Sequence, residues 1–212
     1  MFTQKTLAAA AAIALLPVGA FAGEFSATAG FEASVDFDSD FNQSGDAVEF
    51  SLGGEFEEGG FSAALGLTYD SSAAGSDEVE TELSIAYGGD ITEKAGYEVS
   101  LTSTWLNDSG YDTTEAELGL SYAFSDMAEG SYTYTYDLET EADEHEVAVE
   151  FTVGDWTIEP VLATDGTTDS YELNFGYEFD SGVTMGVEFS DDSAGNNLAT
   201  SLIFGYEIDL LG

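Results

Sequence analysis

The single histidine, His145, is the first side chain whose chemistry has to be weighed, because imidazole serves both as a general base and as a metal ligand. It lies in the sequence Glu144-His145-Glu146. A Ser/His pair for ester hydrolysis would need a serine nucleophile, and no His-x-Ser grouping occurs around His145. We therefore interpret His145 as a surface residue near the end of a loop, and the sequence predicts no enzyme.

Carboxylates are the second group that could do chemistry, because clusters of Asp and Glu can hold calcium. The densest runs are Asp77 to Glu82 and Glu139 to Glu144. Neither run has the spacing or the glycine of a dedicated calcium loop, and no phosphate-cradling glycine motif is present. The sequence therefore predicts no cofactor and no dedicated metal site, only diffuse association with cations.

The charge balance is extreme. All 43 acidic residues follow residue 22, where the only basic side chains are Lys94 and His145, and the formal net charge of the chain is −41. Such a charge excludes nucleic acid as a partner. Because 43% of the residues are hydrophobic and 13% are aromatic, the chain has enough apolar material to fold in spite of this charge.

The first residues predict export. Lys5 supplies a positive region, Leu7 to Leu16 form an apolar region, and Ala20-Phe21-Ala22 is an A-x-A cleavage site. The sequence therefore predicts a secretory signal peptide over 1–22, cleavage after Ala22 and a mature domain over 23–212. An apolar run of about ten residues is too short for a transmembrane helix. There is no cysteine, so no disulfide framework holds the domain together.

The elements that must position these carboxylates are strands. From Phe25 to Phe37 every second residue is apolar and the residues between are small or polar, which is the pattern of a strand with one apolar and one wet face. Similar segments recur along the whole chain and predict about twelve strands, with ten to fourteen possible. The predicted segments are 24–38, 47–57, 61–70, 78–89, 96–106, 113–124, 131–139, 145–154, 156–163, 169–179, 183–190 and 198–210.

The connections alternate between tight turns and looser Ser/Asp/Gly/Asn stretches, as expected for an antiparallel up-and-down barrel with short periplasmic turns and longer outer loops. Pro160 interrupts this reading, because proline removes a backbone donor and a closed barrel has no free edge. We expect a β-bulge or a miscounted strand at Pro160.

The acids follow the same alternation. Apart from Asp169, the first residue of its segment, no Asp, Glu or Lys falls in the apolar register of a predicted strand, whereas about twenty acids fall in the opposite register. A membrane barrel predicts this segregation, because an ionised group facing lipid is costly and one facing a wet pore is not. A soluble acidic β-protein would also place charges outside and remains the architectural alternative. The predicted pore-lining residues are Glu32, Glu49, Glu55, Glu82, Glu98, Glu117, Glu150, Glu172 and Glu188, with Glu82, Glu98, Glu117 and Glu150 nearest the narrow zone.

The signal peptide, the strand from Gly23 to Asp38 and the repeated pattern of the rest resemble the small porin-like outer-membrane proteins of Gram-negative bacteria. The resemblance implies a location in the cell outer membrane, contact with its lipid and insertion by the barrel-assembly machinery. Two features of that family are absent here: the terminal phenylalanine, which Leu211-Gly212 replace, and an arginine-lined constriction.

Two functions follow as hypotheses. The first is a passive channel for small cations or cationic solutes, because rings of Asp and Glu concentrate cations and repel anions. The second is a non-conducting structural or surface-interaction barrel whose acidic loops face other cells or envelope components. Conductance of the purified protein distinguishes them.

Overall fold

The computed structural model describes residues 23–39, 41–72, 77–107, 110–179, 181–193 and 198–210. The predicted signal peptide, its cleavage after Ala22 and the final Leu211-Gly212 lie outside the described residues. Within them, no helix is long and apolar enough to cross a membrane.

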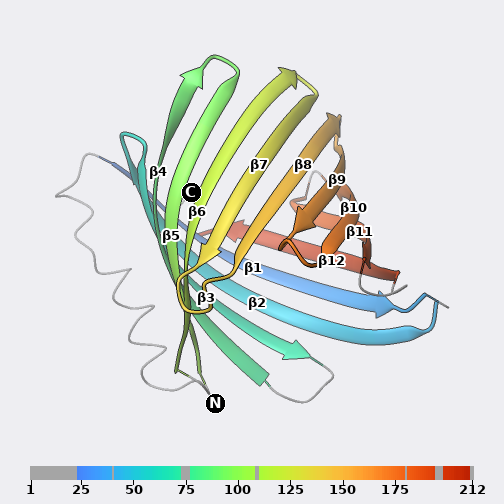
Figure 1. Ribbon diagram of the computed structural model, residues 1–212. Coiled ribbons are helices and arrows are strands. Elements are labelled where there is room, and N and C mark those ends of the chain that lie inside the picture. Colours follow the sequence, from blue (N-terminus) through green and yellow to red (C-terminus); the bar gives the residue numbers. More distant parts are fainter. Residues whose placement is uncertain are drawn as a thin grey trace.

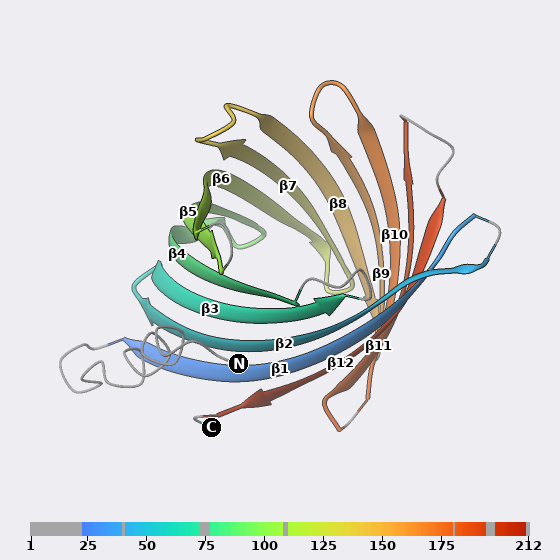
Figure 2. The ribbon, with the colours of Figure 1, turned by 90° about the horizontal axis from the view of Figure 1, so that it is seen from below.

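Twelve strands form one closed antiparallel barrel in which each strand pairs with its neighbours in sequence, and β1 pairs with β12 to close the ring (Figures 1 and 2). The strands are β1 (Glu24–Phe37), β2 (Gln43–Glu58), β3 (Phe61–Ser72), β4 (Asp77–Thr92), β5 (Ala95–Leu106), β6 (Gly110–Ser125), β7 (Ala128–Asp137), β8 (Asp143–Val153), β9 (Trp156–Thr164), β10 (Asp169–Glu178), β11 (Val183–Asp192) and β12 (Ala199–Asp209). The predicted barrel and its number of strands are confirmed.

The expectation of a bulge or a miscounted strand at Pro160 is wrong. Strand β9 runs through Pro160, which pairs with Leu173 of β10. On the other side of β9, the register with β8 is the same at both ends of the strand. His145 pairs with Thr164 at one end and Val153 pairs with Trp156 at the other, and the ladder is interrupted only between these two pairs. The missing proline donor therefore removes local pairing without shifting the strands, because the turn and the flanking pairs hold the register.

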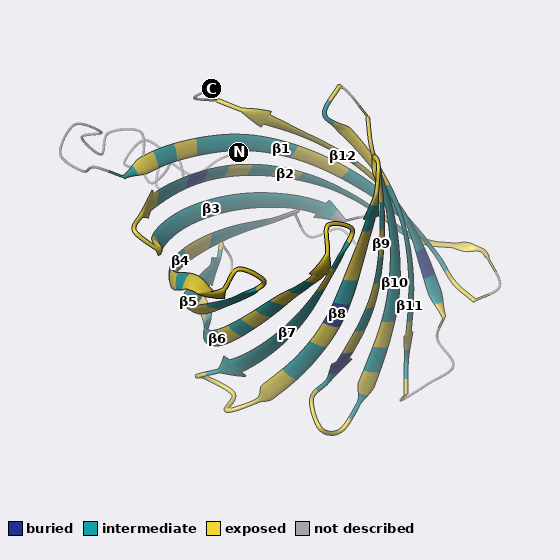
Figure 3. Cartoon of the chain, turned by 90° about the horizontal axis from the view of Figure 1, so that it is seen from above, coloured by how far each residue is buried: buried dark blue, intermediate teal, exposed yellow. Residues whose placement is uncertain are grey.

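The barrel has no conventional apolar core. Among the described residues, the buried hydrophobic side chains are Ala86, Ala148 and Ala163, whereas every strand except β7 has at least one exposed large apolar side chain. Figure 3 shows how few of the described residues are buried. Phe31, Phe50 and Leu101 are examples, and we call the set of strand positions that share their face the apolar register. Exposed apolar surface on this scale needs a cover, and because the single sheet closes on itself without a second layer, lipid is the cover that the fold implies.

Charged residues mark the two limits of the apolar register. On β2, Asp46 and Glu58 share the face of Phe50 and Leu52 and lie at opposite ends of the strand. At about 3.3 Å per residue and a tilt near 45°, this stretch spans about 28 Å along the membrane normal, close to the apolar band of such barrels. Asp143 and Asp191 mark the loop end on β8 and β11. The observed strands extend beyond the predicted segments at these positions, because backbone pairing continues past the last apolar residue.

The turns differ at the two ends, as the sequence predicts. At the end where β1 begins, Gly59 and Gly60 adopt φ values of 60° and 85° in the tight turn between β2 and β3. At the other end, the loop after β9 closes on Asp165, whose Oδ1 accepts hydrogen bonds from the amides of Thr167 and Thr168 at 2.7 Å. These two donors hold the pKa of Asp165 below its usual value. The predicted loops around 73–76, 108–109 and 194–197 fall partly outside the described residues.

The two registers should differ in their tolerance of charge. Leu101 and Ser100 are neighbours on β5, with Leu101 in the apolar register and Ser100 opposite Glu117 in the other. We expect Leu101→Arg to destabilise the bilayer-inserted barrel by about 2–4 kcal/mol and Ser100→Arg to have little effect, because only the first faces lipid. Guanidinium titration in phospholipid bilayers measures both, and equal losses for the two variants would contradict the assigned orientation.

Candidate functional site

The residues between those of the apolar register form the polar register, and they occupy the opposite face of the sheet. Cross-strand partners share a face, so the pairings can be followed from strand to strand around the ring. All nine predicted pore-lining residues lie in the polar register: Glu32 on β1, Glu49 and Glu55 on β2, Glu82 on β4, Glu98 on β5, Glu117 on β6, Glu150 on β8, Glu172 on β10 and Glu188 on β11.

Carboxylates of the polar register on alternate strands lie close enough to interact. Glu117 of β6 and Glu146 of β8 repel each other although β7 separates their strands. Glu188 of β11 and Glu32 of β1 do so across β12. Side chains from alternate strands approach on the inside of a curved sheet and diverge on the outside. The interactions of these four carboxylates are therefore those expected of an inward-facing set.

One row of acids crosses the first three strands. Glu32 lies directly opposite Glu49, and Glu49 lies directly opposite Asp70. Directly opposed side chains have Cβ atoms about 5 Å apart, so these carboxylates repel one another. Asp70, the last residue of the predicted segment 61–70, is absent from the predicted set, and its alternation with Gly66 and Thr68 is the signal that could have included it.

A second row runs from β9 to β1. Its members are successive cross-strand partners: Glu159, Asn174, Glu188, Ser201 and Asp36. The Ser201 hydroxyl donates a 2.8 Å hydrogen bond to Oδ1 of Asp36, so one carboxylate of the row has a neutral donor as its partner. Glu159 and Asn174 belong to this row, and the predicted set omitted both.

Two cavities show how space varies along this face. A cavity of about 210 Å³ is lined by Glu150, Glu159, Asn174 and Glu188, so it joins the two predicted residues Glu150 and Glu188. A cavity of about 780 Å³ opens at the turn end and contains Glu98. Gly88 and Gly119 are the cross-strand partners of Glu98, and the absence of their side chains leaves its carboxylate room.

Neither basic side chain after residue 22 lies among these acids. Lys94 is in the turn between β4 and β5, outside the strands. His145 is on β8 in the apolar register, opposite Tyr134, and its side chain is 42% exposed. The carboxylates of the polar register therefore have no lysine, arginine or histidine within their own register. The described residues contain no group of three or more His, Cys, Asp or Glu side chains that could hold a metal ion.

Comparison with known proteins identifies the fold. No protein-family model matches the chain. No curated protein matches its sequence. Among solved structures, a KdgM porin is similar with a TM-score of 0.62 and 11% identity over 84% of this chain and 98% of that one. The KdgM porin in complex with disordered oligogalacturonate has a TM-score of 0.60 and 12% identity over 84% of this chain and 98% of that one. A mutant of Rh. blastica porin has a TM-score of 0.50 and 11% identity over 87% of this chain and 100% of that one.

These likenesses show that the chain has the closed-barrel fold of porins. At identities of 11% to 12% they establish the architecture of the chain and say nothing about its solute. The predicted resemblance to porin-like outer-membrane barrels is confirmed at the level of the fold.

The wall of the turn-end cavity gives a direct test of its geometry. A Cβ added to Gly60 would lie 2.5 Å from the carbonyl oxygen of Gly88, at a φ of 85°, whereas one added to Gly119 would lie 4.0 Å from the nearest atoms. We expect Gly60→Ala to destabilise the barrel by about 2 kcal/mol or more and Gly119→Ala to be tolerated. Denaturant titration checks this, and a stability loss in Gly119→Ala that matches the loss in Gly60→Ala would contradict the described wall.

Proposed function

We propose that the chain is a passive outer-membrane channel whose acidic lumen prefers small cations or cationic solutes. The observation that supports the proposal is the polar register, which holds many carboxylates and no basic side chain and whose carboxylates on alternate strands interact as expected of a concave face. The proposal also includes the outer membrane as location, its lipid as the cover of the apolar register, and insertion by the barrel-assembly machinery. The porin fold is consistent with each of these.

Simple electrostatics explains why the lumen should be wet and loaded with cations. Two carboxylates about 7 Å apart repel by roughly 0.6 kcal/mol in water and by several times more in a medium of low polarity. Rows such as Glu32, Glu49 and Asp70 would therefore oppose folding unless water and mobile cations screen them. A hydrated interior satisfies this requirement, and it is also the condition for ion passage.

The sign of the charge argues for a solute unlike that of the KdgM porin. One of its structures is a complex with oligogalacturonate, which is a chain of carboxylate-bearing sugars. A lumen lined by glutamates repels such a polyanion and attracts cations. We therefore propose cationic rather than anionic solutes for this chain.

We propose that all nine predicted glutamates line the lumen, and that its narrowest part lies near Glu150 rather than near Glu98. Glu150 belongs to the smaller cavity and shares it with Glu159 and Glu188. Glu98 belongs to the larger cavity, where its neighbours Gly88 and Gly119 leave space. Charges in the narrower part act on a passing ion over a shorter distance, so these three glutamates should dominate selectivity.

The proposal is tested by the reversal potential of the refolded mature chain in a planar bilayer under a potassium chloride gradient. We expect a reversal potential of the sign set by potassium permeation. It should shrink as salt rises, because the screening length falls from about 10 Å at 0.1 M to about 3 Å at 1 M. Replacing Glu150, Glu159 and Glu188 together by Gln should move the reversal potential toward zero.

The matched control replaces three acids in turns and loops: Glu93→Gln, Asp126→Asn and Glu141→Gln. These residues lie between strands, so this triple variant should keep the potassium preference. Anion preference of the unaltered chain, or equal effects of the two triple variants, would contradict the proposal. A folded barrel that conducts in none of several salts would instead support the non-conducting structural barrel.

A further inference from the structure

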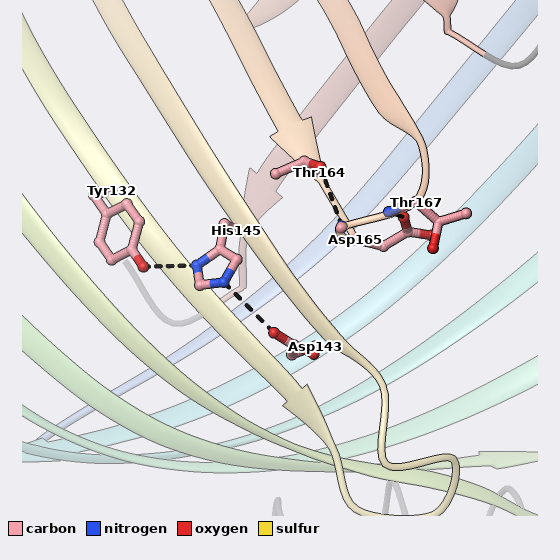
Figure 4. Close-up of polar contacts among 7 residues, drawn as sticks. Tyr132, Asp143, His145, Thr164, Asp165 and Thr167 are labelled. Carbon is pink, nitrogen blue, oxygen red and sulfur yellow. Dashed lines mark hydrogen bonds and ion pairs between the residues drawn. The ribbon is translucent and has the colours of Figure 1, made fainter.

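A cluster held by a hydrogen bond, an ion-pair contact and a ring contact lies apart from the polar register. The hydroxyl oxygen of Tyr132 is 2.8 Å from Nδ1 of His145, and Nε2 of the same ring is 3.5 Å from Oδ2 of Asp143 (Figure 4). The ring of Tyr134 packs on the imidazole with centroids 5.0 Å apart. These four residues form what we call the rim cluster.

The two strands place the rim cluster where the protein meets lipid. Tyr132 and Tyr134 lie on β7, and Asp143 and His145 lie on β8, all in the apolar register. Tyr134 is directly opposite His145, and Thr164 of β9 is opposite His145 on the other side. Asp143 is one of the charges that mark the loop end of the apolar band, so His145 and Tyr132 lie just inside that limit.

The positions of the protons follow from the partners. An ionised carboxylate only accepts hydrogen bonds, so Asp143 favours the tautomer of His145 with its proton on Nε2. The lone pair of Nδ1 then faces the Tyr132 hydroxyl, which donates to it. The phenol therefore already points its proton at a base, and a negative charge lies on the far side of that base.

We propose that the rim cluster is a redox-active tyrosine site, in which Tyr132 reduces peroxyl radicals of membrane lipid. One electron leaves the phenol ring for the peroxyl radical while the phenolic proton moves to Nδ1 of His145. The products are a neutral tyrosyl radical, an imidazolium and a peroxide anion, and the anion takes a proton from water to give a lipid hydroperoxide. The carboxylate of Asp143 stabilises the imidazolium.

Among the tyrosines whose hydroxyl has a described hydrogen-bond partner, Tyr132 is the one that contacts an imidazole. Tyr111 is the useful comparison, because its hydroxyl also lies within hydrogen-bond distance of a base, Oε1 of Glu139 at 2.9 Å, and it shares its proton with Oγ1 of Thr114 at 2.8 Å. A glutamate carboxylate is about two pKa units less basic than an imidazole in ordinary surroundings, so it takes a phenolic proton less readily. Tyr111 should therefore be oxidised less than Tyr132.

The experiment uses the refolded full mature chain in liposomes of dilinoleoyl phosphatidylcholine with a lipid-soluble azo initiator, which generates peroxyl radicals in the bilayer. Electron paramagnetic resonance detects a tyrosyl radical, and the lag before conjugated dienes accumulate measures protection of the lipid. We expect a tyrosyl signal and a lag with the unaltered chain. Both should be lost in Tyr132→Phe and kept in the matched control Tyr111→Phe.

His145→Gln keeps a polar side chain but cannot take the proton, so it should lose the signal as Tyr132→Phe does, and Asp143→Asn should weaken it. Heat-modified migration in detergent gels shows whether each variant still forms the barrel. An undiminished signal in folded Tyr132→Phe or in folded His145→Gln would overturn the proposal, as would equal losses in Tyr132→Phe and Tyr111→Phe. The outcome does not depend on whether the barrel conducts.

Discussion

Closure of the backbone hydrogen-bond ladder is the constraint on which the rest of this structure depends. Inside a bilayer an unpaired amide or carbonyl has no water to bind, so a sheet is stable there only as a ring. The pairing of β1 with β12 completes that ring from Thr28 opposite Asp209 to Phe37 opposite Thr200. With the edges removed, the sheet has two faces of different kind, one convex and one concave, and every strand residue is assigned to one of them by parity.

Parity then separates apolar from acidic side chains, and the separation replaces a packed core. Phe31 and Phe50 pack in the apolar register with tilted rings whose centroids are 5.2 Å apart, while Glu32 and Glu49, their neighbours in sequence, oppose each other in the polar register. The same two strands thus supply an apolar face and carboxylate pairs. The rim cluster departs from this division, because His145 and Asp143 are polar groups in the apolar register. They lie near its loop-end limit, where an interfacial tyrosine can supply a hydrogen bond.

Much of the fold was predictable because the period-two alternation of apolar and polar residues, which assigns side chains to the two faces of a strand, can be read from the sequence. The alternation from Phe25 to Phe37 is enough to predict β1, and the Gly59-Gly60 turn between β2 and β3 is equally local. Long-range arrangement was less accessible. Pro160 pointed to a bulge because the sequence does not show how firmly β8 and β10 hold β9 in register. The contact between Tyr132 and His145 joins two strands across a hairpin, and no spacing rule predicts the direction of either side chain. The smaller cavity also needs five strands in place before it exists.

The most direct measurement is the accessibility of spin labels placed singly along β5 in bilayers, from Gly96 to Trp105, which is practical because the chain has no cysteine. Oxygen partitions into lipid and a nickel chelate stays in water. The account predicts oxygen maxima at Tyr97, Val99 and Leu101, and chelate maxima at Glu98, Ser100 and Thr102. In-phase profiles, or chelate maxima at the apolar positions, would contradict a lipid-facing apolar register around a wet, acidic lumen.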